Sequence, residues 1–361
     1  MRSIIAPLNG VRGFAVLLVV LSHASYHEHH LIEGLNFNGL GKSGVFIFFV
    51  LSAFLLTHGL LVKSRSVADL VAAMPLYLTR RVLRIYPLYL LALTASLAVS
   101  LIYAPFYVDS LGSLIGHLLL LEGRGIFWTI PVEFGYYLIL PIVVAGLLVA
   151  RKRPGLVFTL LILFVTLWQG LFPPEFLPYT PYYLSLFLMG SVAAYAFYYT
   201  ERHYPDMAAS RLFRGLATTA CALSLAAIAL TAPAFWGYLT GREIPQNHFH
   251  YNFIMFGVIS TALILGAAWS APVLRRFFSS RVMVYLGEIS FSIYIWHIFI
   301  ANGLGLFPEI PGPLRFALYG VLVIALAHVS HALVEKPFLK MKSFREIWYW
   351  HHRPKRQRAP A

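Results

Sequence analysis

Residues 44–62 read GVFIFFVLSAFLLTHGLLV, nineteen consecutive positions without aspartate, glutamate, lysine or arginine. A helix needs about 20 apolar residues to cross the ~30 Å hydrocarbon core of a bilayer. The stretch is therefore long enough and apolar enough to span a membrane. Similar stretches recur along the chain, so the sequence predicts an all-α polytopic membrane protein with about ten transmembrane helices. The others lie near residues 7–25, 85–104, 131–150, 155–172, 181–199, 212–232, 250–269, 282–300 and 314–334.

The composition is typical of a protein whose solvent is lipid. Of the 361 residues, 59% are hydrophobic and only 12% are charged, whereas soluble domains carry about 25% charged residues. The net charge of +14 is distributed in short clusters between the apolar runs. This is a membrane-topology pattern, and it argues against a basic face that binds nucleic acid. Cys221 is the only cysteine, so an intrachain disulfide is excluded.

Lysine and arginine alternate between the two sides of the predicted spans. Cytosolic loops carry the excess of these residues, so the clusters predict that both termini are cytosolic. The basic segments are 63–84, 151–153, 200–214, 270–281 and the tail after residue 335. The loops expected to face outward, which hold few basic residues, are 26–43, 105–130, 173–180, 233–249 and 301–313.

Two further segments complete the predicted domain plan. The first apolar run contains Arg12 and ends in a poor cleavage site, so it is interpreted as a retained span. The apolar run 110–121 is too short to cross a bilayer and is expected to be re-entrant or interfacial. Residues 1–340 are expected to form the membrane domain. The tail 341–361 mixes aromatic residues with cations, as suits a segment on the anionic cytosolic leaflet.

Ionisable side chains inside the spans are few, and each costs free energy unless it is paired or hydrated. Arg12 and His23 are eleven residues apart, which puts them on one helix face about 16 Å apart along the axis. A guanidinium can grip phosphate, and an imidazole can act as a base. The alternative is a snorkelling arginine and a hydrogen-bonded interfacial histidine. The other in-span groups are His58, Glu133, His297, His328 and His331.

Leu8-Asn9-Gly10-Val11-Arg12-Gly13-Phe14-Ala15, running on to His23, resembles the opening of the acyltransferase-3 family. Its hallmark is an arginine or lysine, ten residues, then a histidine. Further stretches match family motifs in the family's order, so the resemblance covers roughly residues 1–340. Two departures are Ala53, where glycine is usual, and Phe134, where a polar residue often follows the glutamate. The further matches are 44–55 (Phe-Phe-x-x-Ser-Gly), 80–87 (Arg-x-x-Arg-x-x-Pro), 128–134 (Trp-Ser-Leu-x-Val-Glu), 286–297 (Ser-Tyr-x-Leu-Tyr-x-x-His) and 334–338.

The resemblance implies a membrane O-acyltransferase of surface glycans. We expect it to move an acyl group, most simply acetyl, from cytosolic acyl-coenzyme A to a sugar hydroxyl of a surface or lipid-linked glycan. Its expected partners are therefore acyl-coenzyme A, the glycan acceptor and membrane lipids, with no nucleic acid. Neither a tightly bound cofactor nor a metal is expected. The expected location is a bacterial inner membrane.

The resemblance also assigns expected roles to individual residues. His23 would deprotonate the acceptor hydroxyl, and Arg12 would help to bind the donor. Arg81 and Arg84 lie three residues apart on one helix face and suit nucleotide phosphates. The alternative for these two arginines is that they only anchor the topology. Glu133 would orient His23 or bind the acceptor; the alternative is a carboxylate stabilised at a helix N-terminus.

Three residues are weaker candidates for a pocket lining: Ser52, Tyr86 and His297. A serine in a span commonly bonds to its own backbone, and a histidine in an aromatic span can simply be packed and hydrogen-bonded. Residues 27–30, His-Glu-His-His, invite a metal-site interpretation, but no matched partner at ligand spacing follows, so a solvated loop is expected. The rival function is a transporter or channel that uses the in-span histidines as a proton path.

Overall fold

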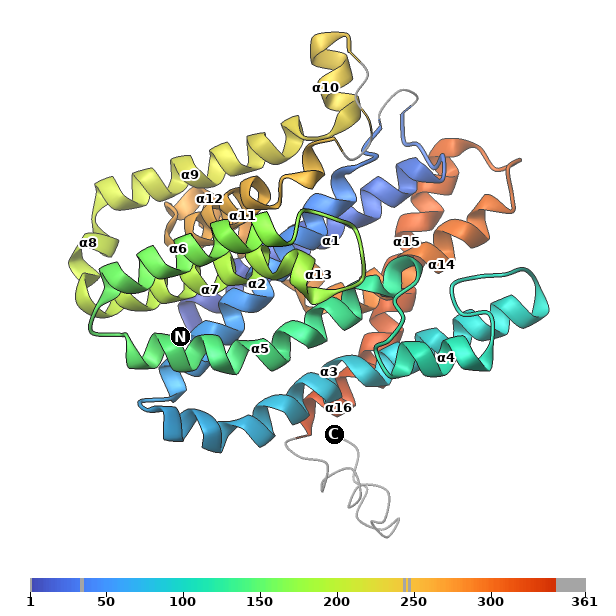
Figure 1. Ribbon diagram of the computed structural model, residues 1–361. Helices are drawn as coiled ribbons and strands as arrows, with labels where there is room; N and C mark the ends of the chain where they lie inside the picture. The colour runs from blue at the N-terminus through green and yellow to red at the C-terminus, as the bar shows by residue number, and fades with distance from the viewer. Residues whose placement is uncertain (1, 33–35, 243–244, 246–247, 342–361) are drawn as a thin grey trace, which may run out of the picture.

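The computed structural model describes residues 2–32, 36–242, 245 and 248–341, and in these residues the chain is helical (Figure 1). The predicted tail 341–361 lies outside the described residues except for its first position. The α-helices are α1 (Arg2–Tyr26), α2 (Leu40–Lys63), α3 (Val67–Ile102), α4 (Leu111–Leu118), α5 (Thr129–Val149), α6 (Pro154–Leu171), α7 (Thr180–His203), α8 (Pro205–Ala209), α9 (Arg211–Leu230), α10 (Pro233–Thr240), α11 (Phe253–Trp269), α12 (Pro272–Phe278), α13 (Arg281–Glu288), α14 (Ser290–Gly305), α15 (Gly312–Ser330) and α16 (Lys336–Lys340). Three short elements are the 3₁₀ turns η1 (Gly125–Trp128) and η2 (Phe249–Tyr251) and the π-helical turn η3 (His331–Glu335).

The helices confirm a polytopic α-helical membrane protein. In the described part of the chain, seven helices are long and apolar enough to cross a bilayer, and two bent helix pairs raise this number to nine. The remaining predicted span, 181–199, corresponds to α7, which has 24 residues but is not among these nine. The orientation of the termini remains a prediction.

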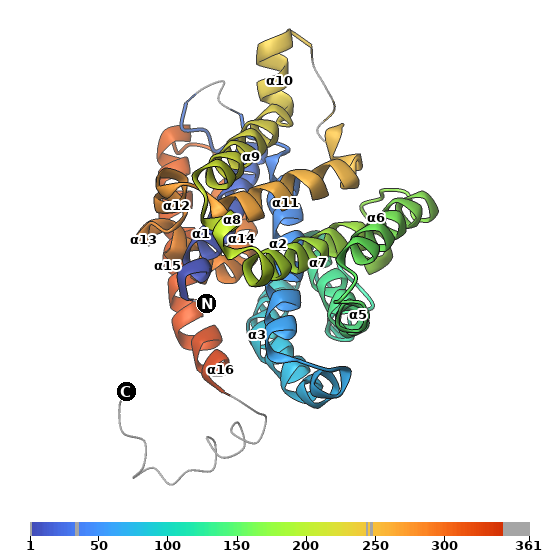
Figure 2. The same cartoon turned by 90° about the vertical axis from the view of Figure 1, so that its left-hand side faces the viewer.

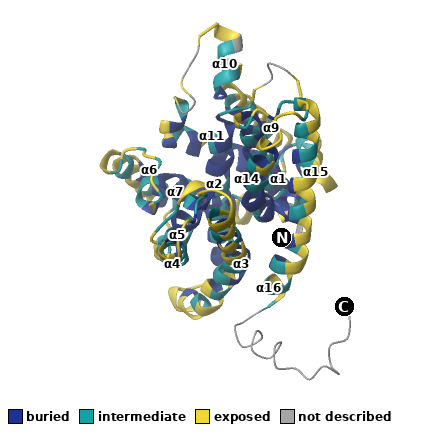
Figure 3. Cartoon of the chain, turned by 90° about the vertical axis from the view of Figure 1, so that its right-hand side faces the viewer, coloured by how far each residue is buried: buried dark blue, intermediate teal, exposed yellow. Residues whose placement is uncertain are grey.

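Buried and exposed helices are arranged as a centre and a rim (Figures 2 and 3). In the most apolar part of α2, 61% of the residues are buried, against 11% in α6. Helices α1, α2, α7, α11 and α14 form the centre, while α6, α9 and α15 expose leucines and valines on the outside. Lipid is the solvent that such apolar exposure requires.

Three predicted spans correspond to helices that bend or that extend beyond the predicted bounds, because hydropathy does not register the direction of a helix or its polar turns. The span predicted at 282–300 is broken, since α13 and α14 meet at a bend of 76°. The span predicted at 250–269 begins at Phe253 and continues, after a bend of 106°, into α12. The span predicted at 85–104 is only the C-terminal part of α3. That helix begins at a capping box in which the Ser66 and Asp69 side chains accept each other's backbone N–H groups.

Glycines in the first motif allow α1 to approach its neighbours closely. A methyl group on Gly10 would collide with the backbone of Phe278 in α12, and one on Gly13 with the carbonyl of Met283 in α13. Only glycine permits this separation, because it has no Cβ. The contact fixes the position of α1 and therefore of Arg12, which lies between the two glycines.

The short apolar run at 110–121 folds as α4, whose eight residues cannot span a bilayer. The buried His117 fastens it: Nδ1 donates to the carbonyl of Ser113, and Nε2 accepts the backbone N–H of Arg124. Arg124 in turn pairs with Asp109 and Glu122. The histidine is thus a structural element of the loop.

Candidate active site

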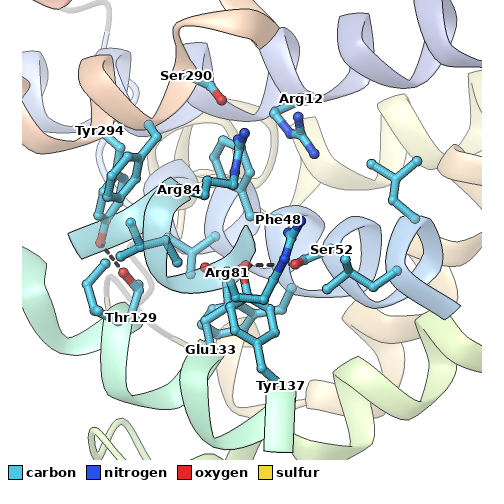
Figure 4. A pocket seen from close by; sticks show the side chains of 17 residues that line it. Arg12, Phe48, Ser52, Arg81, Arg84, Thr129, Glu133, Tyr137, Ser290 and Tyr294 are labelled. Atoms are coloured by element: carbon cyan, nitrogen blue, oxygen red, sulfur yellow. Dashed lines mark hydrogen bonds between the residues drawn. The ribbon is translucent and has the colours of Figure 1, made fainter. Parts of the chain in front are cut away.

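Three arginines converge on one cavity of about 120 Å³ (Figure 4). Arg12 enters from α1, and Arg81 and Arg84 enter from α3, one helical turn apart. Phe48 and Phe49 of α2 contribute an apolar wall. The structure therefore brings together the three residues that the sequence assigned to donor binding. We call this space the arginine cavity.

The charges around the arginine cavity do not balance. Glu133 is the only carboxylate in its described lining, against three guanidinium groups. Among the described residues, none of the three arginines forms an ion pair within 4.0 Å. The Nε atom of Arg81 is buried without a hydrogen-bond partner, although the guanidinium lies 5.7 Å from the centre of the Tyr137 ring. A buried donor without a partner is costly, so the arrangement suits an anionic ligand.

Ser52 and Glu133 form a direct contact inside this cavity. The Ser52 hydroxyl donates to Oε1 of Glu133 over 2.7 Å, joining α2 to α5 (Figure 4). The serine therefore does not bond to its own backbone in this structure. Glu133 lies with the arginines, and the sequence-based idea that it orients His23 finds no support in the geometry, because His23 lines a different cavity.

His23 lines a second, larger cavity of about 470 Å³, which we call the histidine cavity. Its wall includes Lys42 from α2, Tyr107 from the loop after α3, and Asn302 from α14. His27 also lines it, and burial together with repulsion by the neighbouring histidines lowers the pKa of His27 to about 4. His27 is thus neutral at pH 7.

Helix α14 runs past both cavities and separates them. Ser290 and Tyr294 face the arginine cavity, and Ile298 and Asn302 face the histidine cavity. These four residues are spaced by four, so they lie on one helix face. The buried His297 lies near both cavities, with its ring centre 5.7 Å from that of Tyr294 and 4.7 Å from that of His23.

The hydrogen bonds assign a tautomer to both histidines. Nδ1 of His23 lies 2.9 Å from the carbonyl oxygen of Val19, and Nδ1 of His297 lies 2.6 Å from that of Tyr294. A carbonyl only accepts, so Nδ1 carries the proton in each neutral ring and Nε2 is the acceptor. Nε2 of His297 is buried without a partner in the described structure. Both rings therefore offer a lone pair for a proton or a donor group.

The remaining predicted residues have structural contacts. Tyr86 is not part of the lining of the arginine cavity: its hydroxyl donates to the carbonyl of Leu118, and its ring packs on Phe134. His328 bonds to the Tyr285 hydroxyl, and His331 lies 3.5 Å from Glu335. His58 packs between aromatic rings. In the parts of the chain that the structure describes, no three His, Cys, Asp or Glu side chains gather as a metal site.

Tyr294 and Lys42 are site residues that the sequence analysis missed. The signal for Tyr294 is its spacing of four from Ser290, at the start of the helix after the bend. Its hydroxyl donates to the carbonyl of Ile126 and accepts from Thr129, which ties α14 to η1 and α5. For Lys42 the signal is that it is the only lysine or arginine in the loop 26–43, which the sequence predicts to face outward.

Comparison with known proteins matches a family model described as an acyltransferase domain (Acyl_transf_3) to residues 5–331. The chain belongs to this acyltransferase family. This acyltransferase is 30% identical over 309 residues to ORF330 of Acidianus two-tailed virus, which is provisionally named an acetyltransferase; the match covers 82% of this chain and 83% of that protein. No solved structure matches the chain.

Two bacterial relatives carry names that specify O-acetyl transfer. The O-acetyltransferase OatA of Staphylococcus aureus is 22% identical, covering 92% of this chain, and YrhL of Bacillus subtilis, provisionally named a peptidoglycan O-acetyltransferase, is 28% identical, covering 95%. The acyltransferase spans only 57% and 56% of their lengths. Family and names together support a membrane O-acetyltransferase.

Proposed function

We propose that this protein transfers an acetyl group from cytosolic acyl-coenzyme A, held at the arginine cavity, to a sugar hydroxyl of a surface or lipid-linked glycan in the histidine cavity. The observation that carries the proposal is the pair of cavities along one helix, α14, with the His297 ring packed on Tyr294 of the first cavity and on His23 of the second. One cavity offers cations and the other offers a base. A two-substrate transfer across a membrane needs both.

The arginine cavity supplies the chemistry that a coenzyme A donor needs. Guanidinium groups bind phosphate oxygens bidentately and remain charged at all physiological pH values. Arg81 and Arg84 lie near the middle of α3, in the segment 63–84 that the lysine and arginine pattern assigns to the cytosol. The apolar wall of Phe48 and Phe49 suits the uncharged arm and the acyl group.

His23 is the base of the proposed reaction. Nε2 takes the proton of the acceptor hydroxyl while the oxygen attacks the thioester carbonyl carbon. The carbon–sulfur bond breaks, coenzyme A leaves as the thiolate, and the proton taken by His23 passes to that sulfur. The sum is an ester and a free thiol, with no acyl-enzyme intermediate. The hydrogen bond from Nδ1 to Val19 leaves Nε2 free to accept the proton of the hydroxyl and then to donate it to the sulfur.

The test is stoichiometric turnover by the purified protein. We expect one acetylated sugar for each coenzyme A thiol released, measured by mass spectrometry and a thiol assay. Thiol release without any acetylated acceptor, across a panel of glycan fragments, would contradict the glycan part of the proposal. Proton flux through proteoliposomes without thiol release would instead support the transporter interpretation, which membership of an acyltransferase family disfavours.

The direction of transfer follows from the orientation of the chain, which is part of the same proposal. Reporter fusions near residues 70, 152, 207, 277 and 350 are expected inside, and fusions near 35, 115, 176, 243 and 307 outside. A consistent outward signal from the segment 270–281 would overturn this topology. The location in a bacterial inner membrane is tested by fractionation of the same fusions.

A further inference from the structure

A second cationic site lies away from the cavities described above, where α11 bends into α12. The two helices meet at 106°. The sequence pattern puts 270–281 at the cytosolic end of the apolar helix α11, so we expect α12, nearly perpendicular to it, to lie along the membrane surface. In α12, Val273 and Phe277, four apart, are 76% and 47% exposed beside the exposed Arg276, while Phe278 is fully buried against α1. The two exposed apolar side chains are therefore placed to contact lipid next to a cation.

The bend is fastened to α9 by one threonine. Thr218 accepts the backbone N–H of Ala271 over 2.8 Å, and its own hydroxyl donates over 2.7 Å to the carbonyl of Arg214, one turn earlier. Close packing of Gly266 on Cys221 and Ala217 holds the same two helices together. Arg214 of α9 is thus held beside the cations of α12 by the fold.

Two adjoining cavities open at this bend. One, of about 270 Å³, is lined by Arg214, Arg275 and Arg276 with Ser270 and Ser279, and its described lining contains no carboxylate. The other, of about 220 Å³, shares Arg214 and Arg275 and is walled by Trp269 and Phe197, with Glu201 at one side. Glu201 accepts the indole N–H of Trp269. The two cavities share Arg214 and Arg275 and therefore lie next to each other.

We infer that this bend binds the phosphate headgroup of an anionic phospholipid. The guanidinium groups recognise the phosphodiester, and the exposed Val273 and Phe277 of α12 contact the first acyl carbons. A free phosphate or a nucleotide would use only the cationic part. Basic pockets of this kind on the cytosolic side of membrane helices suit lipid headgroups, and the sequence places both segments, 200–214 and 270–281, on that side. The site shares no lining residue with the arginine cavity.

The test compares two pairs of charge removals in the full-length protein. Arg214→Gln with Arg276→Gln removes two cations from the site. Arg211→Gln with Arg281→Gln removes two exposed cations from α9 and α13 that line neither cavity. Each protein is placed in phosphatidylcholine nanodiscs, and phosphatidylglycerol is titrated in and followed by native mass spectrometry. We expect the first pair to weaken phosphatidylglycerol binding about tenfold or more, the loss of a charge-assisted contact, and the second to change it little.

Equal losses in the two pairs would overturn the site in favour of general surface charge. Displacement of phosphatidylglycerol by inorganic phosphate or by coenzyme A at similar concentration would overturn the choice of a lipid. If the first pair fails to fold, Arg214→Lys with Arg276→Lys keeps the charge but loses the bidentate geometry. That variant is then expected to show the selective loss, and unchanged binding in it would reject the inference.

Discussion

The imidazole rings of His23 and His297 lie edge to face, with their centres 4.7 Å apart, beside the histidine cavity. The two residues come from opposite ends of the chain, on α1 and α14. Each ring uses Nδ1 on a carbonyl of its own helix, so both keep Nε2 as an acceptor. We therefore expect the two histidines to act at the same place, His23 as the base and His297 through the hydrogen-bond acceptor Nε2.

His23→Gln is expected to abolish detectable transfer. Glutamine keeps some hydrogen bonding but cannot accept and carry a proton, and general-base catalysis is worth about 10²–10⁴-fold. Donor binding should stay close to that of the parent, because the arginine cavity is intact. Turnover is measured per folded, membrane-inserted molecule. Activity above roughly a tenth of the parent would remove His23 from the chemistry, since a base contributes far more than that.

His297→Phe separates packing from hydrogen bonding. Phenylalanine preserves a ring beside His23 but has no nitrogen, so a residue needed only for packing would tolerate it. We expect turnover to fall about tenfold or more, because the variant loses the hydrogen bond that Nε2 can accept and a hydrogen bond to a charged group contributes about that much. The KM for the donor should be unchanged. The melting temperature of the purified variant is the control. Turnover equal to the parent would show that Nε2 of His297 has no part in the reaction.

Arg81→Ala and Arg84→Ala are each expected to raise the KM for the coenzyme A donor. Losing a charge-assisted phosphate contact costs roughly 1.5–3 kcal/mol, about tenfold or more. Arg80→Ala is the matched control, because Arg80 neighbours Arg81 on α3 but is exposed and outside the lining of the cavity. If all three variants insert normally and bind donor alike, the arginines only anchor the topology.

The sequence identified only some of the residues that line the arginine cavity. Periodicity and the motifs placed Arg12, Arg81, Arg84 and Ser52 among the candidates, because each stands at a polar position of an apolar helix. The contact between Ser52 and Glu133 depends on how α2 packs on α5, and a one-dimensional pattern does not record packing.

The bend between α13 and α14 was missed for a related reason. Hydropathy is the same for a straight and for a broken helix, so residues 282–300 read as one span. Ser290 and Tyr294 line the arginine cavity because α14 begins in a new direction after that bend. Tyr86 was predicted to line the pocket and does not line the arginine cavity. A motif position does not show where a side chain points, and this one points to α4.

His250 is expected to make the protein sensitive to acid. It is fully buried in η2, it lies 2.9 Å from the Ser43 hydroxyl, and burial with repulsion by Lys42 lowers its pKa to about 3. An unfolded histidine titrates near 6.5. Between these values the unfolded chain binds more protons, so stability falls as the pH falls, by about 1.5 kcal/mol from pH 6.5 to 5.

His250→Gln keeps a hydrogen-bonding partner for Ser43 but does not titrate. The drop in melting temperature between pH 7.5 and 5 should therefore be smaller in this variant than in the parent protein. The comparison is made within each protein, so any loss of packing at pH 7.5 cancels. An identical drop would mean that other groups carry the acid sensitivity.

Glu133→Gln tests whether this carboxylate balances the arginines or acts in the chemistry. The glutamine carbonyl can still accept from Ser52, so the variant removes the charge and keeps the contact. Three guanidinium groups then face one another without a carboxylate in the described lining, and uncompensated buried charge is destabilising. The ligand-free protein is expected to melt at a lower temperature. In the proposed reaction acyl-coenzyme A brings phosphate charge to the same cavity, so its stabilising effect should be larger in the variant than in the parent. Ser52→Ala is the matched control, because it breaks the contact and keeps the charge, and its response to the donor should resemble that of the parent. A donor-induced shift no larger in Glu133→Gln than in the parent, together with lost turnover, would assign Glu133 to the reaction itself.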